Sequence, residues 1–147
     1  MATIREIMST DCVTVAPQSS VFDAAAKMRD HDIGFIPVVE GKKLVGVITD
    51  RDLVVRGLAE RKPGTATVNE VMSRQVTTVS PQMSVEEAAK LMANEQIRRL
   101  PVVENGELVG VVAIGDLAVR EKHDEKAGKA LSEISVSEKT LSGAGAK

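Results

Sequence analysis

The sequence predicts an α/β (α+β) fold made of two related halves, each a small sheet with two packed helices. Three observations support this fold class. Residues 4–56 and 68–120 repeat each other without a gap, and nearly half of the aligned positions are identical. Within each repeat, apolar residues at helical spacing alternate with short β-favouring runs. Glycines and prolines separate these segments, so each repeat is expected to contain both helices and strands.

Each repeat opens with a Thr-x-x-Glu capping box, which begins at Thr3 in the first repeat and at Thr67 in the second. Such a box predicts a single helical turn, because its two side chains satisfy the first backbone N–H groups. Short β-favouring segments follow at residues 13–15 and 76–79. A proline stops each of them, so these strands are expected to be brief.

A longer helix comes next in each repeat, with Ser20 and Ser84 as its predicted N-caps. Its apolar stripe has helical spacing, and we expect the methionines in the stripe to fill the core rather than bind a cofactor. The stripe consists of Val21, Ala24, Ala25 and Met28 in the first repeat and of Val85, Ala88, Ala89 and Met92 in the second.

A β-hairpin and a final helix complete each repeat. The predicted strands are residues 35–39 and 44–48 in the first repeat and residues 100–103 and 108–112 in the second. The final helices are expected at residues 50–61 and 115–122.

The domain boundaries follow from the repeat. The first domain is expected at residues 1–62, a breaker-rich linker at 63–67 and the second domain at 68–122. Residues 123–147 form a tail, in which 127–136 has amphipathic helical spacing and the end has the composition of a disordered segment. Neither half is large enough to bury its sheet alone, so we expect the two to pack face to face.

The composition excludes several classes of function. The net charge of −2 provides no field for nucleic acid or an anionic membrane, and the chain has no Trp, no Tyr and two Phe on which bases could stack. No apolar run approaches about 18 residues, and the N-terminus has no signal-like core. A cytoplasmic protein without membrane or nucleic-acid partners is therefore expected.

The candidate site is residues 46–52, where an apolar strand runs directly into a helix. The first N–H groups of such a helix can bind an anion, and Thr49 and Asp52 can add a hydroxyl and a carboxylate. The same two side chains can instead form a capping box that serves only the helix. The residues alone leave both interpretations open.

The duplicated β-α-β-β-α order and the Gly-x-x-Thr-x-x-Asp segment together resemble a CBS domain, and the tandem pair resembles a Bateman module. The resemblance covers about residues 1–122, and the whole chain is similar to small stand-alone bacterial proteins with two CBS domains. It implies an adenosine ligand in clefts between the domains: AMP, ADP or ATP foremost, with NAD or S-adenosylmethionine as alternatives. It also implies a homodimer.

The resemblance assigns roles to individual residues. Thr49 would meet phosphate or ribose, and Asp52 would accept hydrogen bonds from both ribose hydroxyls, as an ionised carboxylate can. Ile36 and Pro37 would form a wall for the adenine, with backbone contacts near Thr14. The full set expected to bind nucleotide is Thr14, Ile36, Pro37, Ile48, Thr49, Arg51, Asp52, Arg98, Arg99 and Asp116.

The second repeat keeps Asp116 but has Ala113 in place of the threonine and Gly115 in place of Arg51. Its site has therefore lost a polar contact and a charge, and it is weaker, differently selective or empty.

Two further arginines distinguish the repeats. Arg99 is predicted to serve, with Arg51, the phosphate of the ligand held by the first repeat, while Arg98 faces the second cleft. The alternative is that Arg98 and Arg99 are solvated or pair with Glu95 and Glu104.

Catalysis has little support, because no Ser-His-Asp order, His-x-x-x-His or Cys-x-x-Cys occurs. A regulatory, non-catalytic nucleotide sensor that signals to an unknown protein partner is the favoured function. The first alternative is a ligand-free assembly module. The second is a metal or redox role that uses His31, His123 and the single cysteine, Cys12, although we expect Cys12 to be a buried apolar residue.

Overall fold

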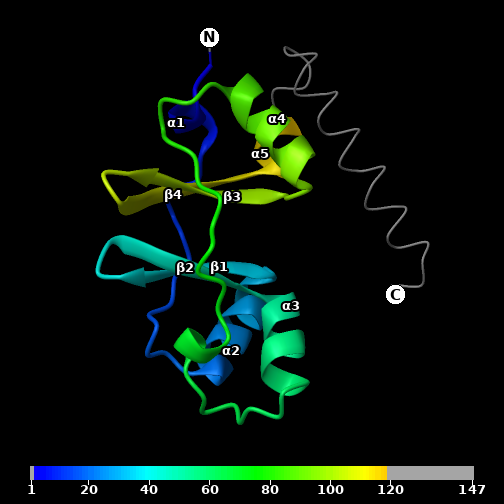
Figure 1. Ribbon diagram of the computed structural model, residues 1–147. Coiled ribbons are helices and arrows are strands. Elements are labelled where there is room, and N and C mark those ends of the chain that lie inside the picture. The colour runs from blue at the N-terminus through cyan, green and yellow to red at the C-terminus, as the bar shows by residue number, and fades with distance from the viewer. Residues whose placement is uncertain (1, 119–147) are drawn as a thin grey trace, which may run out of the picture. The chain divides into compact units, whose positions relative to one another are not determined.

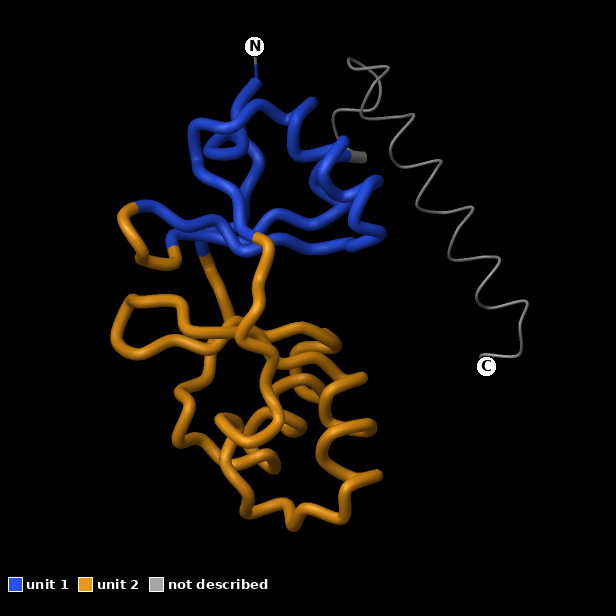
Figure 2. Tube along the Cα trace, in the orientation of Figure 1, with its two compact units in different colours: residues 1–10, 78–104, 109–147 blue, residues 11–77, 105–108 orange. Residues whose placement is uncertain are grey.

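The computed structural model describes residues 2–118 (Figure 1). The predicted tail helix, the end of the tail, His123 and the last residues of the final helix lie outside this range. The chain folds into two compact units, shown in different colours in Figure 2. Within the described range, unit 1 contains residues 2–10, 78–104 and 109–118, and unit 2 contains residues 11–77 and 105–108. The opening turn of each repeat therefore packs with the body of the other repeat.

Unit 2 holds the hairpin and the long helix of the first repeat. The hairpin strands are antiparallel, with Phe35 opposite Thr49 and a bulge between Val38 and Val39, which confirms the predicted hairpin. The long helix α2 packs against β1 and η1. The elements of unit 2 are α2 (Val21–His31), β1 (Phe35–Glu40), β2 (Lys43–Thr49), α3 (Asp50–Asp52), the π-helix η1 (Leu53–Leu58) and the 3₁₀ turn η2 (Val68–Glu70).

Unit 1 holds the corresponding elements of the second repeat, and β3 and β4 are neighbouring strands. Its elements are α1 (Ile4–Ile7), α4 (Val85–Glu95), β3 (Arg99–Glu104), β4 (Glu107–Ala113, whose first two residues belong to unit 2) and α5 (Ile114–Ala118).

The apolar stripes form the centres of the two cores. All four predicted residues of α4 are buried, whereas in α2 Ala24 and Met28 are buried, Val21 is half-buried and Ala25 is exposed. The prediction for Ala25 was wrong. Neighbouring helix residues lie about 100° apart, and only the stripe through Ala24 and Met28 faces the core.

All four predicted N-caps are confirmed. Thr3 and Thr67 form capping boxes with Glu6 and Glu70, in which Oε2 of the glutamate accepts from the threonine N–H at 2.8 and 2.9 Å. Ser20 and Ser84 each accept a hydrogen bond from the backbone N–H three residues later, at 3.0 Å in both helices.

The predicted strands at 13–15 and 76–79 are reduced to single parallel bridges, Val15 to Val38 and Val79 to Val102. The physical reason is the proline two residues after each bridge. The Val15 N–H donates to the Pro37 carbonyl and the Val39 N–H donates to the Val15 carbonyl, so the next donor in the ladder would be residue 17. Pro17 has no N–H and ends the pairing.

The helix predicted at 50–61 ends earlier, at Leu58, and changes from α-helical to π-helical hydrogen bonding. It starts as α3 and continues as η1, where the Ala59 N–H donates to the carbonyl of Val54, five residues earlier, at 2.8 Å. Short π-helical turns frequently occur at functional sites. Within residues 2–118, no helix has the length and apolar character needed to cross a membrane.

Candidate functional site

The junction between β2 and α3 forms a reciprocal capping box. The Thr49 hydroxyl oxygen accepts from the Asp52 N–H at 3.0 Å, and Oδ2 of Asp52 accepts from the Thr49 N–H, also at 3.0 Å. Both side chains are half-buried. The capping interpretation of these residues is therefore confirmed.

The capping box leaves part of each side chain available. Oδ1 of Asp52 has no hydrogen bond to any residue in the range 2–118, and the Thr49 hydroxyl hydrogen has no acceptor in that range. A carboxylate oxygen accepts through two lone pairs, and a hydroxyl can donate while it accepts. Capping and ligand binding at this junction are thus compatible.

The second repeat keeps half of this arrangement. The Ala113 N–H donates to Oδ2 of Asp116 at 2.7 Å, and Asp116 is half-buried like Asp52. Ala113 has no hydroxyl, so the N–H of Asp116 has no side-chain cap from this position. The second junction therefore lacks one of the two capping contacts, while the expected difference in ligand binding stays a prediction.

The apolar residues of the predicted nucleotide-binding set, which include the expected adenine wall of Ile36 and Pro37, are buried in unit 2. Ile36 and Ile48 are both 0% exposed, and Pro37 is buried. In this conformation the two isoleucines offer a ligand only their backbone. Thr14 is half-buried, and its carbonyl accepts from Nζ of Lys27 at 2.8 Å. A ligand contact to that carbonyl would have to share it with the lysine.

The three predicted arginines are exposed. Arg51 follows Asp50, whose Oδ1 accepts from the Arg51 backbone N–H at 2.8 Å. Arg98 and Arg99 belong to unit 1, whereas Thr49 and Asp52 belong to unit 2. The shared phosphate site therefore stays a prediction.

Glu104, one of the alternative partners of the arginines, is engaged elsewhere. Nη2 of Arg5 donates to both of its carboxylate oxygens, at 3.1 and 3.2 Å, and Nε2 of Gln82 donates to Oε2 at 2.9 Å. The hydrogen bond from Gln82, followed by that from Arg5, lowers the pKa of Glu104.

Cys12 is half-buried rather than fully buried as expected, and it is not a core residue of unit 2. Burial, and then the charge of Asp11, raise the pKa of its thiol. At neutral pH the side chain is therefore protonated and weakly nucleophilic, which disfavours a redox-sensing role. His31 is exposed at the end of α2, and residues 2–118 contain no cluster of three His, Cys, Asp or Glu side chains that could hold a metal ion.

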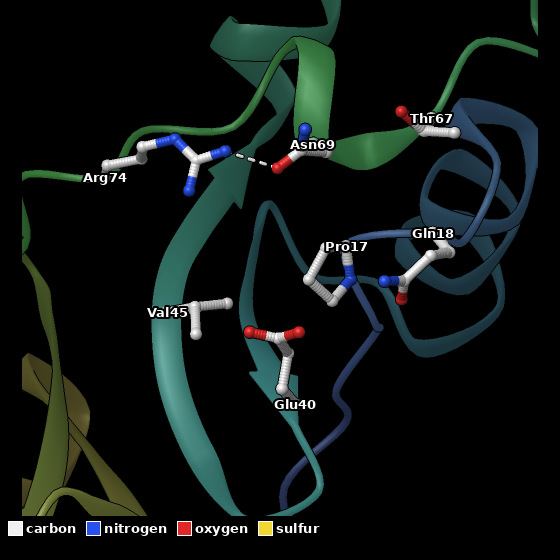
Figure 3. A pocket seen from close by; sticks show the side chains of 7 residues that line it. All are labelled: Pro17, Gln18, Glu40, Val45, Thr67, Asn69 and Arg74. Carbon is white, nitrogen blue, oxygen red and sulfur yellow. Dashed lines mark hydrogen bonds between the residues drawn. The ribbon is translucent and has the colours of Figure 1, made fainter.

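Unit 2 also has a pocket of about 270 Å³ that the sequence did not indicate as a site (Figure 3). It mixes a carboxylate, a guanidinium and amides with apolar walls. Its lining residues are Pro17, Gln18, Glu40, Val45, Thr67, Asn69 and Arg74. None of them belongs to the predicted nucleotide-binding set.

The fold and the duplicated junction are those of CBS domains. A model of the CBS domain family matches residues 4–58 and 68–121, and the chain belongs to this family. The chain is 46% identical over 135 residues to the CBS domain-containing protein YhcV of Bacillus subtilis, an alignment that covers 92% of this chain and 96% of YhcV.

Two solved structures extend the comparison. The chain is similar to Hypoxic Response Protein I, crystallised with two coordinated zinc ions, with 37% identity and a TM-score of 0.74 over 82% of this chain and 99% of that one. It is also similar to CBSX2, crystallised in complex with AMP, with 28% identity and a TM-score of 0.75 over 84% of this chain and 100% of that one. The chain thus contains a tandem pair of CBS domains.

Proposed function

We propose that the protein is a regulatory, non-catalytic module that binds an adenosine nucleotide and passes the signal to a protein partner in the cytoplasm. Membership of the CBS family and the AMP complex of CBSX2 support an adenosine ligand. A change in the arrangement of the two domains on binding would carry the signal, since a ligand shifts an equilibrium only through its different affinities for two states.

The observation that carries the proposal is the geometry of Thr49 and Asp52. Oδ1 of Asp52 is an unused acceptor on a half-buried carboxylate, and it suits the two hydroxyl donors of a ribose. The Thr49 hydroxyl lies at the start of the continuous helix formed by α3 and η1, where backbone N–H groups favour a phosphate. Arg51, exposed one residue away from Asp52, provides a positive charge.

Thermal unfolding with and without millimolar AMP, ADP, ATP, NAD or S-adenosylmethionine tests the proposal. A ligand at 100 times its dissociation constant adds about 2.7 kcal/mol of stability, which appears as a rise of several degrees in Tm. Asp52→Asn is the sharpest variant, because the amide oxygen can still accept from the Thr49 N–H while the negative charge is lost. Asp116→Asn is its matched control.

We expect Asp52→Asn to abolish most of the ligand-induced rise and Asp116→Asn to retain most of it. An equal loss in both variants would contradict the asymmetry between the repeats. The absence of a rise with all five compounds would refute nucleotide binding.

A second candidate is a ligand-free assembly module. It is supported by the capping box itself, which gives Thr49 and Asp52 a structural role, and by the exposure of large apolar residues on one helix. Val54, Val55 and Leu58 of η1 are 56%, 45% and 76% exposed. This candidate predicts a homodimer whose Tm rises with protein concentration and does not respond to nucleotide.

A metal-responsive role is the weakest candidate. The zinc ions of Hypoxic Response Protein I motivate it, but His31 belongs to no group of three metal-ligating side chains within residues 2–118. A zinc titration followed by Tm would detect it.

A further inference from the structure

The pocket of unit 2 has a counterpart in unit 1, and the repeat makes the two comparable residue by residue. The Asn69 N–H donates to the Pro17 carbonyl at 2.9 Å, and the Arg5 N–H donates to the Pro81 carbonyl at 3.0 Å. The neighbouring hydrogen bonds match as well, because the N–H groups of residues 68 and 4 donate to the carbonyls of residues 19 and 83. Arg5 therefore occupies in unit 1 the position that Asn69 occupies in unit 2.

The remaining pocket residues are also paired by the repeat. The glutamates stand at the last position of β1 and of β3, and the glutamines follow equivalent prolines. The pairs, with the unit 2 residue first, are Gln18 with Gln82, Glu40 with Glu104, Val45 with Val109, and Arg74 with Thr10.

In unit 1 the glutamate binds a guanidinium from its own chain. Arg5 donates to both carboxylate oxygens of Glu104, at 3.1 and 3.2 Å, and Gln82 donates to the same carboxylate at 2.9 Å. One guanidinium nitrogen thus reaches both carboxylate oxygens, in a charge-assisted contact.

In unit 2 the same acceptor has no such partner. Asn69 is too short to replace the arginine, and its Oδ1 accepts a hydrogen bond from Arg74 (Figure 3). The Glu40 side chain makes no hydrogen bond or ion pair with any residue of the described range, 2–118. Its carboxylate points into the pocket between Pro17 and Val45. The space that the Arg5 side chain fills in one repeat is open in the other.

We propose that this pocket is a receptor site for a guanidinium group, which Glu40 binds as Glu104 binds Arg5. The volume of about 270 Å³ is just below the range of about 300–1,000 Å³ typical of drug-sized ligands, so it suits a group of the size of one side chain. Pro17 and Val45 provide apolar surface for the methylene stem. Gln18 corresponds to the glutamine that donates to the carboxylate in unit 1.

The guanidinium can belong to a free small molecule or to an arginine side chain of another protein. Arg74 bears on this choice, because a positive charge at the rim disfavours a second lone cation and favours a ligand that also carries a carboxylate. Free L-arginine has both groups, and N-acetyl-L-arginine amide imitates an arginine within a chain. The site is independent of the nucleotide site, since the two share no residue.

The test is a titration of the ¹⁵N-labelled full chain followed by amide chemical shifts. L-Arginine is expected to shift the amides around Glu40, Val45 and Asn69, with a dissociation constant on the order of millimolar. L-Citrulline, which has the same shape and no charge, is the control ligand. Shifts of equal size with L-citrulline would overturn the proposal. If N-acetyl-L-arginine amide binds as well as L-arginine, the source is a protein side chain, and if only L-arginine binds, it is a free compound.

Four variants give the matched controls. Glu40→Gln is expected to weaken binding at least about tenfold, because it removes the charge-assisted bonds. Asn69→Arg should close the pocket from within and also abolish binding, while Glu104→Gln should leave it unchanged. Arg5→Asn should open the counterpart and produce new shifts around Glu104. Binding retained by both Glu40→Gln and Asn69→Arg, in spectra that show folded protein, would refute the site.

Discussion

Thr49→Ala separates the structural role of the β2–α3 junction from its proposed ligand role. The substitution removes the oxygen that accepts from the Asp52 N–H at 3.0 Å and leaves this half-buried N–H without a side-chain cap. Loss of a threonine N-cap costs about 1 kcal/mol, within a range of about 0.5–2 kcal/mol. For a chain of this length, 1 kcal/mol corresponds to a fall in Tm of about 3–5 °C. The second repeat shows that the fold tolerates alanine here, because Ala113 occupies the equivalent position.

The assay is urea unfolding of the ligand-free protein, with Ala113→Thr as the reciprocal variant. We expect Thr49→Ala to lower the midpoint at unchanged m-value and Ala113→Thr to raise it, because the second variant adds the missing half of a capping box around Asp116. If Thr49→Ala leaves the free energy of unfolding unchanged, the hydrogen bond does not stabilise the junction and the capping argument fails. If the ligand-induced Tm rise survives in Thr49→Ala, the hydroxyl has no role in binding.

Three other predictions follow from single contacts. Gly46→Ala would place a Cβ 2.6 Å from the Ser73 backbone carbonyl oxygen, so it should destabilise the protein by about 1–3 kcal/mol in urea unfolding. Gly115→Ala should introduce no such clash, since no atom of residues 2–118 outside its chain neighbours and its own helix backbone lies within 4 Å of the place its Cβ would take. The hydrogen bond from the backbone N–H of Thr67 is the main cause that lowers the pKa of Glu70. The ionised Glu70 therefore stabilises the fold above the ordinary pKa of 4.5, and this stabilisation is lost as the pH falls through the lower pKa of the folded protein. Glu70→Gln should flatten the dependence of Tm on pH below 4.5, and an unchanged profile would contradict this argument. Because burial raises the pKa of Cys12 above 9.0, its alkylation by iodoacetamide should be slower at pH 7–8 than that of a free cysteine. A rate equal to that of the free thiol would contradict the effect of burial on this side chain.

Local signals in the sequence predicted most of the fold. The capping boxes, the two hairpins and the long helices are each encoded within a few residues, so periodicity and cap chemistry were enough to place them. The short strands were predicted to be brief because a proline ends each of them, and they are shortened further to single bridges, since Pro17 has no N–H to continue the ladder. The exposure of Ala25 depends on the width of the face that α2 presents to β1 and η1, which only the packed structure defines.

For the functional sites too, the sequence predicted what is local and missed what is assembled from distant segments. The sequence identified the Thr49 and Asp52 pair and its weakened copy, because both lie within one turn of helix. It did not indicate the pocket around Glu40, which is assembled from four separate segments. A signal was nevertheless present in the repeat: Glu40 and Glu104 are identical, whereas the partner of Glu104, Arg5, aligns with Asn69. A retained acceptor whose donor has been replaced is the feature that would have predicted an open site.

The exchange of opening turns between the repeats predicts which fragment of the chain can fold. The core of unit 2 includes Val68, Val71 and Met72, which are 0%, 0% and 4% exposed and follow the first repeat in sequence. Each such side chain contributes about 1.5–3 kcal/mol when buried, so their loss would remove most of the stability of a small domain.

A fragment of residues 11–77, which keeps these three side chains, should therefore unfold more cooperatively in urea than a fragment of residues 1–62, although the second corresponds to the first repeat with its own opening turn. Far-ultraviolet circular dichroism across the urea titration distinguishes them. The triple variant of the 11–77 fragment with alanine at these three positions is the control, and it should behave like residues 1–62. A cooperative transition in the 1–62 fragment would mean that Ile4, which is 0% exposed in unit 1, can replace Val68 in the core of its own repeat. The pairing of each opening turn with the other repeat would then be unnecessary for folding.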